Sequence, residues 1–283
     1  MLALDGDAGT DVYRLVARQF FGTSLRHVER DGASLSLTRY PAETRQPWHT
    51  HENATLFLLI RGDFTDRSWT SETAMDSLSI VYHPTDEPHQ SEAGMEGAVG
   101  LNIDLSPSWI RRRGFGPSDL GSYAVMTHST ARLAGLKLLV HAFSPSAAAN
   151  DELERDLEAL IGELRSARRS LSDKPAPSWL PAVESWLTQS LDDATGLRDA
   201  ARAACVHPVY LARVFRAHYG CSVGEFIRRQ RIIRAASYAL QTDANLADAA
   251  HEARFADQSH FTRLFTRAMG VSPKVLLRIR ASL

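Results

Sequence analysis

Three histidines in the first third of the chain have the spacing of a metal site. His49 and His51 are separated by one residue and stand directly before an apolar run, and His89 follows the next apolar run. On a strand, residues two apart point to the same side, so His49 and His51 can converge, and His89 joins them if the two strands pair. Three imidazoles are sufficient for a site that holds a divalent metal such as zinc or iron. The alternative is that these histidines form the polar lining of a pocket and hold no metal.

Aromatic residues near the three histidines are candidates for a ligand pocket. Trp48 directly precedes the first of them, and Tyr82 lies near the end of the second apolar run. Trp48, Tyr82 and Trp69 are candidates for the wall of a ligand-binding pocket beside the histidines, and ordinary core packing is the favoured alternative. His83 is expected to face away from the site.

A second group of residues with chemical potential lies in the last hundred residues, where a short motif repeats. Leu-Ala-Arg-Val-Phe at residues 211–215 matches Phe-Thr-Arg-Leu-Phe at 261–265, and each copy is followed by a glycine and a serine at the same distances. Helical spacing puts the apolar residues of each copy on an inner face. The outer-face residues are Val209, Ala212, Arg213 and Arg216 in the first copy and Gln258, Ser259, Thr262 and Arg263 in the second. Arg recognises guanine, Gln recognises adenine, and Ser and Thr bind either base, so the repeat favours two DNA-reading helices over ordinary solvated faces.

The histidines must be positioned by strands. Short runs rich in Leu, Ile, Phe and Tyr at residues 33–40, 55–60 and 78–83 are separated by glycine and proline, and such spacing is typical of a β-barrel or sandwich. From residue 129 the pattern becomes helical, with apolar residues sharing a face at 133–140 and at 153–164. Leu153, Leu157, Leu160 and Leu164 follow the 4-3-4 spacing of a helix-pair seam. This seam is expected to pack against a second copy of the chain or against the helix at 133–140.

The repeated motifs must be positioned by helices. A proline-containing linker at 170–181 leads into a helical segment without strand signals, with helices predicted at 197–204, 208–218, 222–241, 246–253 and 257–269. Pro208 suits a first helical position, Asp257 suits an N-cap, and Gly220 and Gly270 suit helix ends. The helix at 222–241 separates the two motifs by about 27 Å, which approaches the ~34 Å between successive major-groove faces on one side of a duplex.

Charge is divided unevenly along the chain. Residues 181–283 carry 14 Lys and Arg against 9 Asp and Glu, whereas residues 1–180 carry 18 against 24, and a basic part suits nucleic acid. Two cysteines, Cys205 and Cys221, leave no disulfide framework. The start of the chain lacks the basic region of a signal peptide, and no apolar run has the roughly 20 residues of a membrane span. We therefore expect a cytoplasmic protein without membrane partners.

The last 100 residues closely resemble the DNA-binding domain of the AraC/XylS family of transcription regulators. The resemblance rests on His207–Phe215, Tyr219–Gly220, Glu225–Arg231, Phe255–Phe265 and Gly270–Pro273. It implies that Val209, Ala212 and Arg213 occupy base-reading positions of one helix-turn-helix unit, and that Gln258, Ser259, Thr262 and Arg263 occupy those of a second. Two departures are Cys205 and Arg254, which stand where the family commonly has glycine in the turn.

The histidine pattern resembles the two motifs of a cupin barrel, which often hold a metal with three His and one Glu. Here the position of that Glu falls on Thr55 or Leu56, so the fourth ligand is missing. The family resemblance implies instead a cupin-like sensor that holds an organic effector and no metal. The expected fold class is α+β, with a cupin-like β-barrel, linking helices and an all-α domain with two helix-turn-helix units.

Three functions compete for this sequence. The first is a ligand-responsive, sequence-specific regulator that is no enzyme and has double-stranded promoter DNA and a small-molecule effector as partners. The family resemblance adds RNA polymerase, if the protein is an activator, and a homodimer. The predicted domains are a sensor at 1–128, a linking or dimerisation segment at 129–169, a linker at 170–181 and a DNA-binding domain at 182–283. The second function is a metal-dependent cupin dioxygenase or isomerase with an accessory helical domain, which leaves the repeat unexplained. The third is a DNA-binding protein whose barrel only dimerises.

Overall fold

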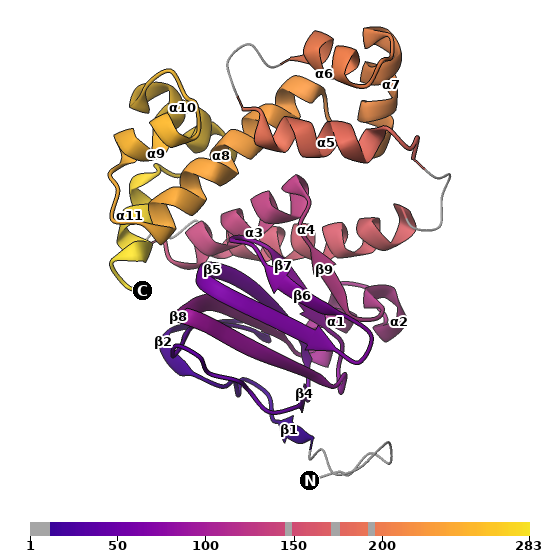
Figure 1. Ribbon diagram of the computed structural model, residues 1–283. Helices are drawn as coiled ribbons and strands as arrows, with labels where there is room; N and C mark the ends of the chain where they lie inside the picture. The colour runs from indigo at the N-terminus through magenta and orange to yellow at the C-terminus, as the bar shows by residue number, and fades with distance from the viewer. Residues whose placement is uncertain (1–11, 145–148, 171–175, 192–195) are drawn as a thin grey trace. The chain divides into compact units, whose positions relative to one another are not determined.

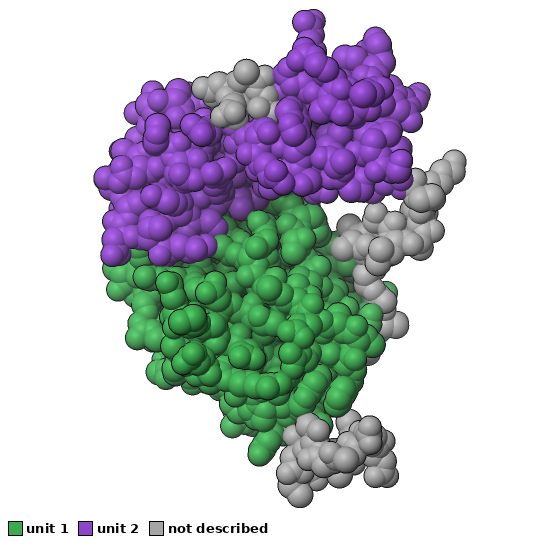
Figure 2. All heavy atoms as spheres, viewed as in Figure 1, with its two compact units in different colours: residues 1–167, 278–283 green, residues 168–277 purple. Residues whose placement is uncertain are grey.

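The computed structural model describes residues 12–144, 149–170, 176–191 and 196–283. The chain divides into two compact units, one of residues 1–167 with 278–283 and one of residues 168–277 (Figure 2). The predicted α+β class is confirmed, because the strands come first and the second unit is helical (Figure 1). The predicted boundaries at residues 128, 169 and 181 stay predictions, since the division into compact units does not show where each functional segment begins or ends.

A nine-stranded sheet forms the first unit, and its two longest strands organise it. β8 pairs with β3, β4 and β5, while β5 also pairs with β6 and β7, and β1, β2 and β9 are added at the edges. The strands are β1 Tyr13–Leu15, β2 Thr23–Arg30, β3 Ala33–Tyr40, β4 His49–His51, β5 Ala54–Ser68, β6 Glu72–Met75, β7 Ile80–His83, β8 His89–Leu105 and β9 Ala124–Met126. β2 was not predicted, because its exposed face leaves few apolar residues to reveal a strand.

The expected closed barrel is instead an open, curled sheet. Over the residues that the structure describes, β1 pairs with β4 alone and β9 with β7 alone, so no ladder closes the ring. The long β5–β8 ladder shifts register on both sides of Gly62, and such bulges bend a strand. Gly62 has a φ of +83°, and a Cβ there would lie 2.0 Å from the carbonyl oxygen of Gly97. This glycine pair lets the two strands bend together around the core.

Helices α3 and α4 pack as an antiparallel pair within the first unit. Glu163, near the end of α4, accepts a hydrogen bond from Thr130 at the start of α3, while His141 at the end of α3 contacts Asp156. The stripe of Leu153, Leu157, Leu160 and Leu164 is almost fully buried in this single chain. The apolar stripe is therefore buried within one chain. The helices of this unit are α1 Pro107–Arg112, α2 Pro117–Leu120, α3 Ser129–Ala142 and α4 Ala149–Ser170.

The second unit consists of two similar helical groups joined by one long helix. The helices are α5 Leu180–Gln189, α6 Leu197–Ala203, α7 Pro208–Tyr219, α8 Val223–Gln241, α9 Leu246–Glu252, α10 Gln258–Met269 and α11 Lys274–Arg280. The predicted ends are confirmed: Gly220 and Gly270 terminate α7 and α10 in the left-handed conformation, and Asp257 caps α10. None of the described helices has both the length and the apolar character to cross a membrane.

Candidate functional site

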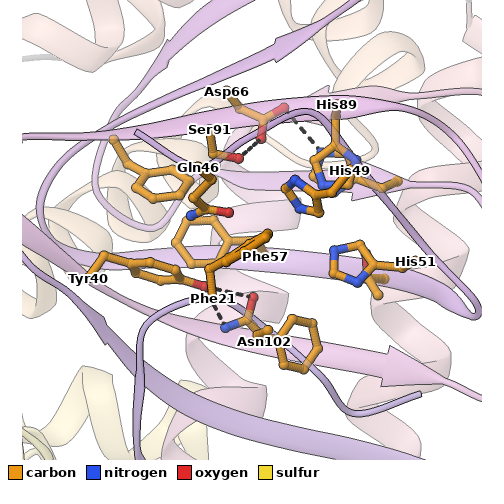
Figure 3. A pocket seen from close by; sticks show the side chains of 14 residues that line it. Phe21, Tyr40, Gln46, His49, His51, Phe57, Asp66, His89, Ser91 and Asn102 are labelled. Atoms are coloured by element: carbon orange, nitrogen blue, oxygen red, sulfur yellow. Dashed lines mark hydrogen bonds and ion pairs between the residues drawn. The ribbon is translucent and has the colours of Figure 1, made fainter. Parts of the chain in front are cut away.

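The sheet brings the three predicted histidines together in one buried cavity. His49 lies directly opposite His89 in the β4–β8 ladder, and strand alternation turns His51 to the same side as His49. One ring nitrogen from each lies within 4.8 Å of the other two, and all three side chains are buried. Figure 3 shows the three rings at one end of the cavity. The geometry is that of a cluster of three convergent imidazoles.

Backbone hydrogen bonds orient two of these rings in the same way. His49 Nδ1 lies 2.8 Å from the carbonyl oxygen of Pro47, and His89 Nδ1 lies 3.1 Å from that of Glu87. A carbonyl oxygen only accepts, so each Nδ1 carries the proton and donates. The Nε2 lone pairs of His49 and His89 are then available inside the cavity. Second-sphere bonds of this kind fix the tautomer of metal-binding histidines.

Burial keeps the cluster neutral. It lowers the pKa of His49 to about 4 and that of His51 to about 2, with the positive charges of neighbouring histidines adding to the effect on His51. Burial likewise holds the pKa of His89 well below the ordinary range. At neutral pH all three rings are therefore unprotonated, which is the form that binds metals.

The expectation that His83 faces away is wrong. Its ring stacks on that of His89, with centroids 3.5 Å apart and planes 12° apart. Strand β7 is buried along its whole length, so no alternation of polar and apolar residues reveals which side faces the cavity. Tyr82 points to the opposite side and is outside the cavity lining. Trp48 stacks on Trp69 at 4.1 Å instead of lining the cavity.

Asp66 is a site residue that the sequence analysis missed. Its carboxylate is fully buried, with Oδ1 3.1 Å from His83 Nε2 and Oδ2 accepting a 2.8 Å hydrogen bond from Ser91 Oγ. Burial opposes ionisation of this group, but the charge and hydrogen bond of His83 outweigh it and lower the pKa of Asp66. The sequence signal that could have revealed Asp66 is its position two residues after the apolar Phe64, because alternate residues of a half-buried strand face the same inner side.

The other end of the cavity is polar but small. Asn102 donates hydrogen bonds of 2.9 Å to Tyr40 Oη and to Thr38 Oγ1. Thr55, at the position considered for the missing Glu, lines the cavity, and its buried hydroxyl has no hydrogen-bond partner among the described residues. The cavity has a volume of about 20 Å³, and roughly 10–15 Å³ is needed for one water. The space suits an ion or one or two molecules of the size of water.

The predicted reading helices α7 and α10 present the expected outer faces. The sequence 211–215 and the sequence 261–265 have the same pattern of buried and exposed side chains, with aromatic or leucine side chains at both ends buried. All eight predicted reading residues are at least partly exposed: Val209, Ala212, Arg213, Arg216, Gln258, Ser259, Thr262 and Arg263. On α10 the four predicted residues share a shallow groove with Thr266 and Arg267, which the sequence analysis did not include.

The turns before both helices are also alike. Cys205 and Arg254, the two departures from glycine, both adopt the left-handed conformation, with φ of 53° and 60°. His207 Nδ1 then accepts a hydrogen bond from the backbone of Val209, and Asp257 accepts one from His260. The turns thus keep a glycine-type geometry although they carry side chains, at some cost in backbone strain.

Known proteins resemble the second unit over its helical repeat. A helix-turn-helix domain family matches residues 200–279. The transcriptional activator AarP of Providencia stuartii is 33% identical over 90 residues, which are 32% of this chain and 67% of AarP. The activator NphR of Rhodococcus is 36% identical over 95 residues, 33% of this chain and 28% of NphR. The first unit lies outside the matched helix-turn-helix family.

Solved structures show a weaker likeness. ToxT of Vibrio cholerae with an unsaturated fatty acid bound is 12% identical and covers 87% of this chain and 95% of its own, with a TM-score of 0.40. The C-terminal domain of the response regulator AraT of Geobacillus stearothermophilus is 24% identical over 38% of this chain and 88% of its own, with a TM-score of 0.35. At such scores the likeness says nothing about what the first unit of this chain binds.

Proposed function

Because the chain belongs to the AraC/XylS family of transcription regulators, we propose that it controls transcription by binding promoter DNA through α7 and α10 and by sensing a ligand in its first unit. The observation that carries the proposal is the pair of exposed helix faces with one burial pattern, repeated at a distance of 50 residues. Helix α8 between them has 19 residues and is about 28 Å long. This length supports two readers that engage successive major-groove faces.

The two reading helices differ in chemistry. On α7, Val209 is 70% exposed and Tyr210 40% exposed, and apolar side chains contact the methyl group of thymine. On α10, Gln258 and Arg263 offer donors for adenine and guanine. Arg263 makes no ion pair with any described residue and so has its guanidinium available for DNA. We expect the half of the operator that α7 contacts to be read through thymine methyl groups and the half that α10 contacts to be read through hydrogen bonds.

An operator selected from random DNA tests whether α7 and α10 recognise bases in these two different ways. Duplexes are enriched from a random pool with the full chain, and binding is measured by fluorescence anisotropy at one salt concentration. Arg263→Ala should lose about 1–3 kcal/mol on the selected site and relax the preference at one base pair. Replacing one thymine by deoxyuridine should cost about 1 kcal/mol in the parent chain and nothing in Val209→Ala. Equal losses on selected and random DNA would make both residues backbone contacts and contradict the proposal.

The first unit supports a metal-binding sensor. The three imidazoles of His49, His51 and His89 offer neutral nitrogen donors, and an unpartnered Thr55 hydroxyl faces the same cavity. Tetrahedral zinc at ~2.0–2.1 Å from nitrogen needs donors about 3.3 Å apart, so the observed cluster would have to tighten slightly. We propose that these histidines hold one zinc or iron ion per chain. Metal analysis of the purified protein and of His89→Ala tests this, since the variant should lose the ion.

A metal-dependent dioxygenase or isomerase would use the same histidines. A cavity of about 20 Å³ is far below the roughly 300–1,000 Å³ of sites for drug-sized organic molecules. We therefore propose a regulator and no enzyme. Its place of action is the cytoplasm, where a bacterial-type promoter lies.

The remaining partners are proposed from the family. RNA polymerase is a partner if the protein is an activator, as several relatives are named. A homodimer also remains a proposal, although the α4 stripe that suggested it is buried within one chain. A small-molecule effector is a further partner that the family suggests.

A further inference from the structure

The size of the histidine cavity limits what the first unit can sense. Its volume of about 20 Å³ holds little more than one water. Phe21 packs edge-on to His49 at 5.0 Å between ring centroids, and Phe20 lies 5.4 Å from His51. These rings fill the space beside the imidazoles that an organic ligand would need. A species bound here is therefore an ion with one or two small ligands.

The charge of the cavity favours a cation. The three histidine donors are neutral, so a divalent ion among them would bring two positive charges into a buried place, and isolated buried charge is costly. Asp66 is the acidic side chain among the described residues that line the cavity. It is fully buried and held by two partners, His83 at 3.1 Å and Ser91 at 2.8 Å. The buried carboxylate places negative charge beside the three neutral donors, and this charge favours a cation among them.

His83 connects this carboxylate to the histidine cluster. It contacts Asp66 through Nε2 and stacks face to face on His89 at 3.5 Å. The stack restrains the plane of the His89 ring, while the backbone bond to Glu87 fixes its tautomer. Asp66 thus acts on the cluster through His83 and not by direct contact. Carboxylate–histidine pairs beside metal ligands are a common way of setting metal affinity.

We propose that the effector of this regulator is a divalent transition-metal ion, bound by His49, His51 and His89. Asp66 and His83 form the positioning pair that sets the affinity of these histidines for the metal. The inference rests on the metal site proposed above and adds that the ion is the regulatory signal. Thr55 has a free hydroxyl in the cavity for hydrogen bonding to a small ligand that completes the coordination.

The test measures metal binding and DNA binding separately on the full chain. The protein is stripped with a chelator, then titrated with Zn²⁺ and, without oxygen, with Fe²⁺, against a competing chromophoric chelator. DNA binding to the selected operator is measured with and without each metal. We expect at least one of the two ions to bind at one per chain and to change operator affinity by about 5- to 150-fold, the usual range of allosteric coupling.

Two matched carboxylate variants test the role of Asp66. Asp66→Asn should weaken metal binding by about 10- to 100-fold, as loss of an outer partner does, while operator affinity at saturating metal stays at the parent value. Glu72→Gln removes an exposed carboxylate from the adjacent strand β6 and should change neither. If Asp66→Asn does not fold, Ser91→Ala, which removes only one hydrogen bond to Asp66, should show a smaller loss in the same direction.

Each contrary result has its own meaning. Metal that binds without changing operator affinity overturns the effector inference but leaves the metal site and DNA binding intact. A folded, DNA-binding chain that takes up no metal refutes the proposed metal site and the inference together. Unchanged metal affinity in both Asp66→Asn and Ser91→Ala overturns the role of Asp66. A metabolite that shifts the melting temperature and operator affinity of the metal-free chain, where metals do not, also overturns the inference.

Discussion

At the scale of single residues, the two units treat their polar side chains in opposite ways. The first unit buries neutral imidazoles and the carboxylate of Asp66, and the second leaves Arg213, Arg216 and Arg263 exposed. Buried donors suit a small ligand that must lose its water, because such a site is already desolvated. Exposed arginines suit phosphates and base edges, which stay hydrated until binding.

The buried histidines should make the metal-free first unit sensitive to acid. The pKa of His49 is about 4 in the folded chain, below its ordinary value of 6.5, so the unfolded chain binds a proton first as pH falls. The stability that the neutral ring contributes is complete above pH 6.5 and is lost as pH falls to about 4, by about 3 kcal/mol for His49 alone. Urea midpoints between pH 7.5 and 4 measure this loss. His49→Gln should have a shallower pH dependence, and an equal slope would contradict the assignment.

At the scale of elements, the helical repeat depends on its turns and on the long connecting helix. Both turns place a non-glycine residue in the left-handed conformation, which keeps the reading helix at its angle to the preceding helix. Helix α8 buries Ala235, Ala236 and Ala239 completely, and these small side chains let the flanking helices approach it closely.

The first turn should be relieved by glycine. A residue with a Cβ in the left-handed conformation is strained by roughly 1–2 kcal/mol. Cys205→Gly relieves this strain but increases the conformational entropy of the unfolded chain. We expect a net gain of about 0.5–1 kcal/mol in the free energy of unfolding. Cys205→Ala is the matched control, since it removes the thiol and keeps the strain. Thermal melts of the three chains measure the difference, and a Gly variant no more stable than the Ala variant would disprove it.

The connecting helix should couple the two reading helices. Ala235→Pro removes a backbone hydrogen bond and inserts a ring into the helix, at a cost of about 3 kcal/mol or more. It should abolish the advantage of an operator with both half-sites over a single half-site, as measured by anisotropy. The exposed Arg228→Ala on the same helix provides a control for helix content. Retention of the two-site advantage in Ala235→Pro would show that α7 and α10 read DNA independently.

At the scale of the whole molecule, the burial of the α4 stripe bears on whether two chains associate. The α4 stripe that suggested a dimer is buried within one chain, and α3 and α4 contact each other through Thr130 with Glu163 and through His141 with Asp156. The surface for a dimer, if one forms, must lie elsewhere.

Leu157→Glu with Leu160→Glu tests this assignment. Two unpaired charges in the buried stripe should unfold the first unit, because each costs several kcal/mol. Circular dichroism should show loss of strand and helix signal, and light scattering should show aggregates. The conservative pair Leu157→Met with Leu160→Met should remain folded. A folded monomer from a parent dimer would instead restore α4 as the dimer interface.

The sequence alone determined the DNA-binding part of this protein. The repeat of 50 residues, the glycine helix ends and the outer faces of α7 and α10 follow from local periodicity, since a helix places its faces by spacing within a few residues. The pairing of His49 and His51 also followed from strand alternation. Only the tertiary structure decided that the sheet stays open, that His83 and Asp66 join the cavity, that Trp48 and Tyr82 do not, and that the α4 stripe is filled. Each of these depends on which distant strands and helices meet, and a strand buried on both sides, such as β7, carries no polarity pattern to reveal it.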